Sequence, residues 1–157
     1  MHTLGRHLII ELFSCDSERL NCIPTISAAL RGAAEAIGAT IVSEAFHQYA
    51  PQGVSGVLLI AESHMSVHTW PEAGYVALDI YTCGDLDPRP GARLMGQALG
   101  AAQCRLQETL RGLPEHIAAA RPLLPDDIVI VDGGAGEEIP LDGRPRPAET
   151  LSDRALS

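Results

Sequence analysis

The densest group of chemically reactive side chains in this sequence lies between residues 61 and 84, which read AESHMSVHTWPEAGYVALDIYTCG. This stretch contains Ser63 followed at once by His64, then His68, and finally Cys83 near its end. Serine and cysteine are nucleophiles, and histidine gains or loses a proton close to neutral pH. We therefore interpret this stretch as the part of the chain that performs catalysis.

The basic residues restrict the amine chemistry that this chain can perform. All 11 of them are arginine, and the sequence contains no lysine. Enzymes hold pyridoxal phosphate as a Schiff base with a lysine, so an internal Schiff base of that kind is excluded here. Any chemistry on a substrate amine must take its carbonyl group from another source.

Three motifs in the reactive stretch follow one another: E-S-H at 62–64, H-T-W-P-E at 68–72 and D-x-x-T-C-G at 79–84. In order and spacing they resemble the S-adenosylmethionine decarboxylase family of bacteria and archaea. The resemblance extends to four shorter blocks: L-G-R-H at 4–7, G-A-T-I at 38–41, F-H at 46–47 and G-V-S-G at 53–56. It covers roughly residues 4 to 110.

The resemblance implies that the chain is a proenzyme that cuts itself between Glu62 and Ser63. In this chemistry Ser63 Oγ attacks the Glu62 carbonyl, and an N-to-O acyl shift converts the peptide bond into an ester. A β-elimination then releases residues 1–62 and leaves dehydroalanine, which becomes a pyruvoyl group at position 63. The pyruvoyl carbonyl would form a Schiff base with the substrate amine and accept the electrons left when carbon dioxide departs.

The same resemblance implies roles for five further residues. His68 would move protons during self-cleavage, and Ser55 would assist at the oxyoxazolidine stage. Cys83 would return a proton to the substrate α-carbon, a task that a thiol can perform. Glu72 would accept hydrogen bonds from the ribose hydroxyls of the substrate. Tyr49 stands where the family usually has a phenylalanine that stacks on adenine, and a tyrosine keeps that aromatic face.

The substrate is less constrained than the mechanism. Glu72 and Tyr49 together favour S-adenosylmethionine, whose decarboxylated form donates the aminopropyl group of spermidine. The alternative is decarboxylation of arginine or ornithine by the same pyruvoyl chemistry, because Glu72 could equally pair with a guanidinium or ammonium group. Tyr49 and Ala73, a position that is commonly aromatic in the family, are where such a change would show.

Two other functions fit parts of the pattern. His64, His68 and Cys83 could bind zinc, with Glu72 acting as the base. Strand spacing would hold the two imidazoles far apart, so we expect no metal. An inactive regulatory subunit would be expected to lack Ser63, His68 or Cys83, and all three are present. Each side chain alone could be structural, but their joint spacing favours self-cleavage.

The periodicity of apolar residues predicts the elements that position these side chains. We expect strands at residues 8–13, 39–49, 54–60, 74–82 and 104–110. We expect helices from Ile23 to Ile37 and over 88–102, the first with Pro24 in its opening turn and Gly38 as its stop. These elements predict a two-layer α+β fold in which an antiparallel sheet of four or five strands carries two helices on one face.

The sheet face opposite the helices needs cover, and a second copy of the chain is a natural source. The family resemblance implies a homodimer with shared active sites, whose partner in the reaction is a small-molecule substrate. The net charge of −9 argues against nucleic acid or an anionic membrane as a partner.

The chain divides by composition into a domain over residues 1–112 and a tail over 113–157. The tail holds six of the 11 prolines, and only 128–131 reads as a strand there. We expect about the last fifteen residues to be disordered. The sequence lacks a stretch typical of a signal peptide or a membrane span, so we expect a cytoplasmic protein with reduced thiols at Cys15, Cys22, Cys83 and Cys104.

Overall fold

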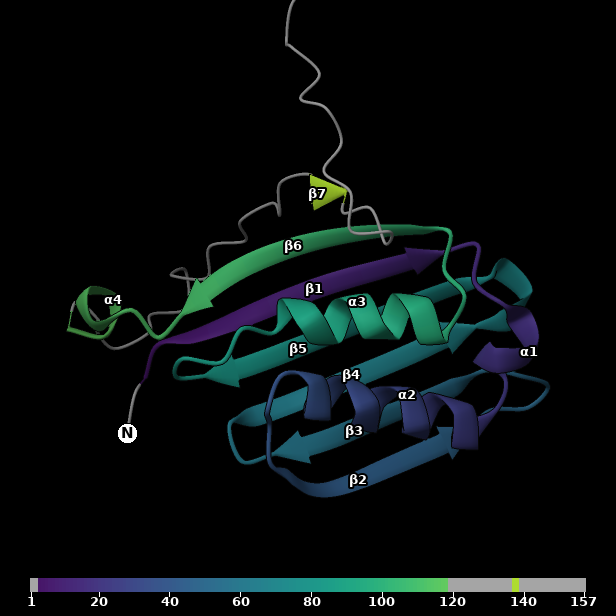
Figure 1. Ribbon diagram of the computed structural model, residues 1–157, viewed down its shortest axis with the longest axis horizontal. Coiled ribbons are helices and arrows are strands. Elements are labelled where there is room, and N and C mark those ends of the chain that lie inside the picture. The colour runs from purple at the N-terminus through teal and green to yellow at the C-terminus, as the bar shows by residue number, and fades with distance from the viewer. Residues whose placement is uncertain (1–2, 119–136, 139–157) are drawn as a thin grey trace, which may run out of the picture.

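Figure 1 shows a computed structural model of the chain, which describes residues 3–118 and 137–138. The strands are β1 Gly5–Phe13, β2 Ile41–Gln48, β3 Val54–Ile60, β4 Ser63–Trp70, β5 Tyr75–Cys83, β6 Gln103–Arg111 and β7 Glu137–Glu138. The helices are α1 Ser17–Leu20, α2 Ile23–Ala36, α3 Arg89–Ala98 and α4 Pro114–Ala118, and a 3₁₀ turn, η1, spans Pro71–Ala73.

The strands form one antiparallel sheet in the order β2-β3-β4-β5-β1-β6-β7. The expected α+β fold is confirmed, but the expected count of four or five strands is wrong, because the described residues form six long strands and the two-residue β7. The long strand missing from the prediction is β4, which carries the residues of the reactive stretch. Its polar and apolar residues do alternate, but it contains few aliphatic side chains to mark it as a strand.

Helix α2 and helix α3 lie side by side over the same face of the sheet (Figure 1). Helix α2 has Pro24 in its first turn and ends before Gly38, as expected. Helix α3 ends at Ala98 rather than at residue 102, because Gly100 has a φ of 68° and turns the chain toward β6. The expected strand at 128–131 and the expected disorder near the C-terminus lie outside the described residues.

The core lies between the two helices and the sheet. Alternate residues of each central strand point toward the helices, as the two-residue repeat of a strand requires. The largest fully buried side chains are Leu8, Ile10, Leu12, Leu20, Ile26, Leu30, Leu58, Met65, Ile80, Met95, Leu99 and Val54. The other set of alternate residues lies on the sheet face that α2 and α3 leave bare, which we call the open face.

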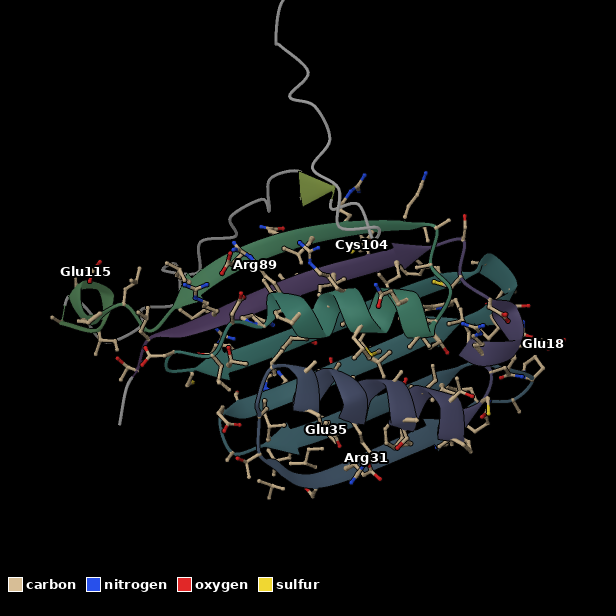
Figure 2. The ribbon with its side chains drawn as sticks, in the orientation of Figure 1. Glu18, Arg31, Glu35, Arg89, Cys104 and Glu115 are labelled. Carbon is tan, nitrogen blue, oxygen red and sulfur yellow. The ribbon has the colours of Figure 1, made fainter. Side chains whose placement is uncertain are left out.

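Ion pairs link helices α2 and α3 to the sheet, and Figure 2 labels the two arginines that form them, Arg31 and Arg89. Arg31 of α2 lies 3.1 Å from the Glu44 carboxylate on β2, and Arg89 at the start of α3 contacts Glu108 on β6. Such exposed pairs add little to stability on their own, so burial in the core dominates. Among the described residues, the structure contains no helix long and apolar enough to cross a membrane.

Thr69 of β4 joins three separate segments through its buried hydroxyl. The hydroxyl donates a hydrogen bond to the Leu20 carbonyl of α1 at 2.8 Å and accepts one from the Val54 N–H of β3, also at 2.8 Å. The side chain is 6% exposed, so water cannot replace either contact. The threonine of the H-T-W-P-E motif thus holds α1 against the sheet.

We predict that Thr69→Val lowers the free energy of unfolding by about 1–3 kcal/mol, because it keeps the shape but leaves two buried backbone groups without partners. Urea denaturation of the variant in a Ser63→Ala chain, which stays in one piece, measures this. Thr109→Val, at an exposed position of β6, is the matched control and should change stability by less than about 0.5 kcal/mol. Equal losses in the two variants would contradict the assignment.

Candidate active site

The side chains singled out from the sequence gather at two ends of the open face. One group surrounds Ser63 and Cys83, where β4 begins and β5 ends, and we call it the Ser63 cluster. The other surrounds Ser55 and His68, which face each other across β3 and β4, and we call it the His68 cluster. Within one chain the two clusters lie toward opposite ends of β4.

The peptide bond between Glu62 and Ser63 lies where a two-residue turn leads from β3 into β4. The Cys83 N–H donates a hydrogen bond to the Glu62 carbonyl oxygen at 2.9 Å. The Glu62 carboxylate accepts a hydrogen bond from the Thr40 N–H at 3.1 Å, which fixes the turn from the other side. A backbone donor in this position polarises the carbonyl and would stabilise negative charge on its oxygen during attack by a nucleophile.

A chain of polar contacts leads away from Ser63. Its hydroxyl oxygen lies 3.2 Å from Nδ1 of His64, and Nε2 of His64 lies 3.2 Å from Oδ2 of Asp79. Oδ2 of Asp79 also lies 3.1 Å from Nε2 of His7. The Ser66 hydroxyl donates to the second oxygen of the same carboxylate.

Sequence reasoning gave no role to His7, Ser66 or Asp79. The available signal was that His7 ends the L-G-R-H block and Asp79 opens the D-x-x-T-C-G block. Their meeting depends on the pairing of β1 with β5 and of β5 with β4, which sets His7, His64 and Asp79 on one face. That pairing joins residues far apart in the chain, so the sequence alone did not reveal it.

Tyr81 and Arg111 close the Ser63 cluster on its other side. The Arg111 guanidinium lies 4.6 Å from the centre of the Tyr81 ring. Burial raises the pKa of Tyr81, its hydrogen bond and electrostatic interaction with Cys83 raise it further, and the charge of Arg111 acts in the opposite direction. The Tyr81 hydroxyl therefore stays protonated near neutral pH and can donate to the Cys83 sulfur.

The His68 cluster contains the second pair of predicted residues. Ser55 Oγ lies 2.6 Å from Nδ1 of His68, and the Tyr49 hydroxyl lies 3.3 Å from Ser55 Oγ. His68 and Ser55 line a shallow pocket of about 310 Å³ on the open face, together with His47. The His47 and Tyr49 rings meet edge to face, with their centres 4.6 Å apart.

Glu72 and Ala73 belong to η1, which follows β4 at the same end of the sheet. A Glu72 carboxylate oxygen accepts a hydrogen bond from Gln52 Nε2 at 3.0 Å. Gln52 lies in the turn that follows Tyr49, so this contact links the acid to the aromatic residue. The Tyr49 side chain is 50% exposed, and it can therefore present its ring to a ligand.

The two clusters are too far apart to form one site within a single chain. Ser63 and His68 are five residues apart along β4, so their Cα atoms are separated by about 17 Å. The zinc set of His64, His68 and Cys83 is not assembled either. Within residues 3–118, the histidines, cysteines and acids whose donor atoms lie within 4.8 Å of one another are His7, His64 and Asp79.

The four cysteines are unpaired. Burial raises the pKa of Cys15 and of Cys104 to about 11, so both remain neutral core residues. Hydrogen bonds from the side chain and the backbone N–H of Thr25 lower the pKa of Cys22. Of the four thiols, Cys83 is the one that lies beside the candidate cleavage point.

The chain is similar to several known proteins. The family model for S-adenosylmethionine decarboxylase matches residues 6–112. An S-adenosylmethionine decarboxylase proenzyme of Anoxybacillus flavithermus is 47% identical over 124 residues, which cover 78% of this chain and all (100%) of that protein. One from Thermosipho africanus is 43% identical over 118 residues, covering 74% of this chain and 91% of its own. The crystal structure of the adenosylmethionine decarboxylase from Aquifex aeolicus matches with a TM-score of 0.67 at 33% identity, covering 72% of this chain and 94% of that one.

Proposed function

The chain belongs to the S-adenosylmethionine decarboxylase family, and from that premise we propose that it is a proenzyme that cuts itself between Glu62 and Ser63 to become a pyruvoyl-dependent S-adenosylmethionine decarboxylase. The proposal is supported most directly by the hydrogen bond from the Cys83 N–H to the Glu62 carbonyl, beside the Ser63 hydroxyl. A serine next to a polarised carbonyl is what an N-to-O acyl shift requires.

The roles that we propose for individual side chains follow from their positions. Ser63 attacks the Glu62 carbonyl and becomes the pyruvoyl group, which supplies the carbonyl for the substrate amine and takes up electrons as carbon dioxide leaves. His68, hydrogen-bonded to Ser55, moves the proton of the later elimination step. Cys83, with the Tyr81 hydroxyl at its sulfur, returns a proton to the substrate.

Cleavage at Glu62 would leave the two fragments interleaved in one sheet. Residues 1–62 carry β1, β2 and β3, whereas β4, β5 and β6 belong to the larger fragment. Strand β3 pairs with β4, and β1 pairs with both β5 and β6. The fragments should therefore stay associated, because separating them would break three strand pairings.

We predict that the purified protein migrates as one species under native conditions and as fragments 1–62 and 63–157 on a denaturing gel, with masses confirmed by mass spectrometry. Ser63→Ala should stay uncut, because it lacks the attacking oxygen. His68→Ala should stall as an ester, which hydroxylamine then cleaves. An intact wild-type chain with a free Ser63 after prolonged incubation would contradict the proposal.

We further propose that two copies of the chain form a dimer through their open faces. Within one chain Ser63 and Cys83 lie about 17 Å from Ser55 and His68, so an antiparallel second copy would bring the opposite clusters together. The open face also carries exposed apolar side chains suited to an interface, namely Ile9, Val57, Leu59 and Trp70, each between 41% and 47% exposed. These observations support the expectation of shared active sites.

We predict that mixing inactive Ser63→Ala chains with inactive His68→Ala chains restores partial cleavage, because one of the two sites in a mixed dimer would then be intact. The cleaved chains should be those that carry Ser63, which a mass tag on one variant identifies. Sedimentation of the fully active protein as a monomer would be incompatible with shared sites.

We propose S-adenosylmethionine as the substrate. The relatives described above are named for this compound, which favours it over arginine or ornithine. Glu72, held by Gln52, is suited to accept hydrogen bonds from the ribose hydroxyls, and the exposed Tyr49 ring is suited to stack on adenine. An aromatic face also attracts a nearby sulfonium cation.

We predict release of labelled carbon dioxide from carboxyl-labelled S-adenosylmethionine and none from arginine or ornithine offered in parallel. Glu72→Gln should raise KM for S-adenosylmethionine by about tenfold or more while leaving self-cleavage unchanged, because the carboxylate acts on the substrate only. Release from arginine or ornithine alone would overturn the choice of substrate and leave the pyruvoyl mechanism standing. The cytoplasmic location and the domain boundary at residue 112 remain predictions from the sequence.

A further inference from the structure

Self-cleavage begins when Ser63 Oγ loses its proton, and the roles proposed above assign no base to this step. His68 of the same chain is about 17 Å away along β4. It is also assigned to the later elimination, after the ester has formed. A base for the first step must be within hydrogen-bond reach of Ser63 Oγ.

We propose that His64 is this base, and that Asp79 and His7 hold it in the required tautomer. His64 Nδ1 lies 3.2 Å from Ser63 Oγ, and Nε2 of the same ring lies 3.2 Å from Asp79 Oδ2. Serine, imidazole and carboxylate therefore follow one another as in other sites that activate a serine. This inference rests on the proposed self-cleavage and adds a catalytic residue to it.

The partners of Asp79 determine which nitrogen of His64 carries the proton. An ionised carboxylate only accepts hydrogen bonds, so the ring nitrogen that faces it must be the donor. Nε2 of His64 faces Asp79 Oδ2, and a neutral His64 therefore has its lone pair on Nδ1, toward Ser63. The Ser66 hydroxyl donates to the other carboxylate oxygen and so helps to keep Asp79 an acceptor.

His7 is oriented in the same way from the other side. Arg111 Nη1 lies 3.3 Å from His7 Nδ1, and a guanidinium can only donate, so Nδ1 of His7 is the acceptor. Nε2 of His7 then carries the proton and donates to Asp79 Oδ2 at 3.1 Å. Arg111 thus donates to His7, and His7 and His64 both donate to Asp79, so these hydrogen bonds converge on the Asp79 carboxylate.

The acyl shift can be written with every proton accounted for. As Ser63 Oγ bonds to the carbonyl carbon of Glu62, its proton passes to His64 Nδ1, and the carbonyl oxygen becomes an anion that faces the Cys83 N–H at 2.9 Å. The bond from that carbon to the Ser63 nitrogen then breaks. The nitrogen takes the proton from His64, the carbonyl reforms as an ester, and His64 returns to its neutral form.

The same three side chains could in principle bind a divalent cation, since their donor atoms lie within 4.8 Å of one another. The contacts to Asp79, at 3.1 and 3.2 Å, have the length of hydrogen bonds. The guanidinium of Arg111 also points at His7 from outside the group and would repel a cation. Proton transfer accounts for all of these contacts, so we assign the group to the cleavage step.

The test compares freshly translated full-length His64→Gly with His68→Ala and wild type, following the uncut chain on denaturing gels. We expect His64→Gly to cleave about 100-fold more slowly than wild type, the usual loss for a general base. Hydroxylamine should not cut the stalled His64→Gly chain, which retains its amide, whereas it should cut the His68→Ala ester. Added imidazole should restore cleavage of His64→Gly, which a purely structural role would not allow.

A second variant keeps the test decisive if His64→Gly folds poorly. Asp79→Asn keeps the shape of the acid but removes the charge that fixes the His64 tautomer, and should slow cleavage by about tenfold or more with the circular dichroism spectrum unchanged. The inference would be overturned if His64→Gly or Asp79→Asn cleaved at the wild-type rate. It would also be overturned if hydroxylamine cut the stalled His64→Gly chain, or if EDTA abolished cleavage of the wild-type chain. Failure of the wild-type chain to cleave would instead refute the proposed function.

Discussion

The register of β4 between β3 and β5 is the constraint on which the rest of the structure depends. The two-residue repeat of this strand sends Met65, Val67 and Thr69 into the core and leaves its histidines on the open face. A shift of one residue would exchange the two sets, burying imidazoles and exposing the core. The hydrogen bonds of β4 to β3 and β5 therefore fix both the packing of the core and the placement of the reactive side chains. A change of register in β4 would disturb both.

The sheet order gives this small protein two properties that a simple meander would lack. Strand β1, from the segment before the cleavage point, lies between β5 and β6, so the cut proposed at Glu62 would leave an intact sheet. Helices α2 and α3 cover the same face, which leaves the opposite face, among the described residues, available to a second chain. The self-cleavage and the shared sites that we propose therefore both depend on this strand order and on the placement of α2 and α3 on one face.

The sequence predicted the helices and five of the long strands because their apolar residues recur at clear spacings, as in Leu8–Leu12 of β1 and Ile26–Leu30 of α2. It failed at β4, because the open-face residues of this strand include serine and histidine rather than the aliphatic side chains that mark the other strands. The end of α3 was also misjudged, because alanines and Leu99 continue the helical pattern past the point where Gly100 turns the chain. In both places local composition competed with a requirement set elsewhere in the fold.

For the site, the sequence by itself determined the chemical inventory: a serine after a glutamate, a second histidine at a fixed spacing, a cysteine near the end of the reactive stretch, and no lysine that could serve a pyridoxal cofactor. Motif spacing carries such information because neighbouring residues in a chain stay neighbours. Only the tertiary structure decided that Cys83 N–H meets the Glu62 carbonyl and that His7 and Asp79 join His64. Those relations depend on strand pairings between distant parts of the chain. Backbone hydrogen bonds can pair any two strands of a sheet, so local sequence does not encode which strands meet.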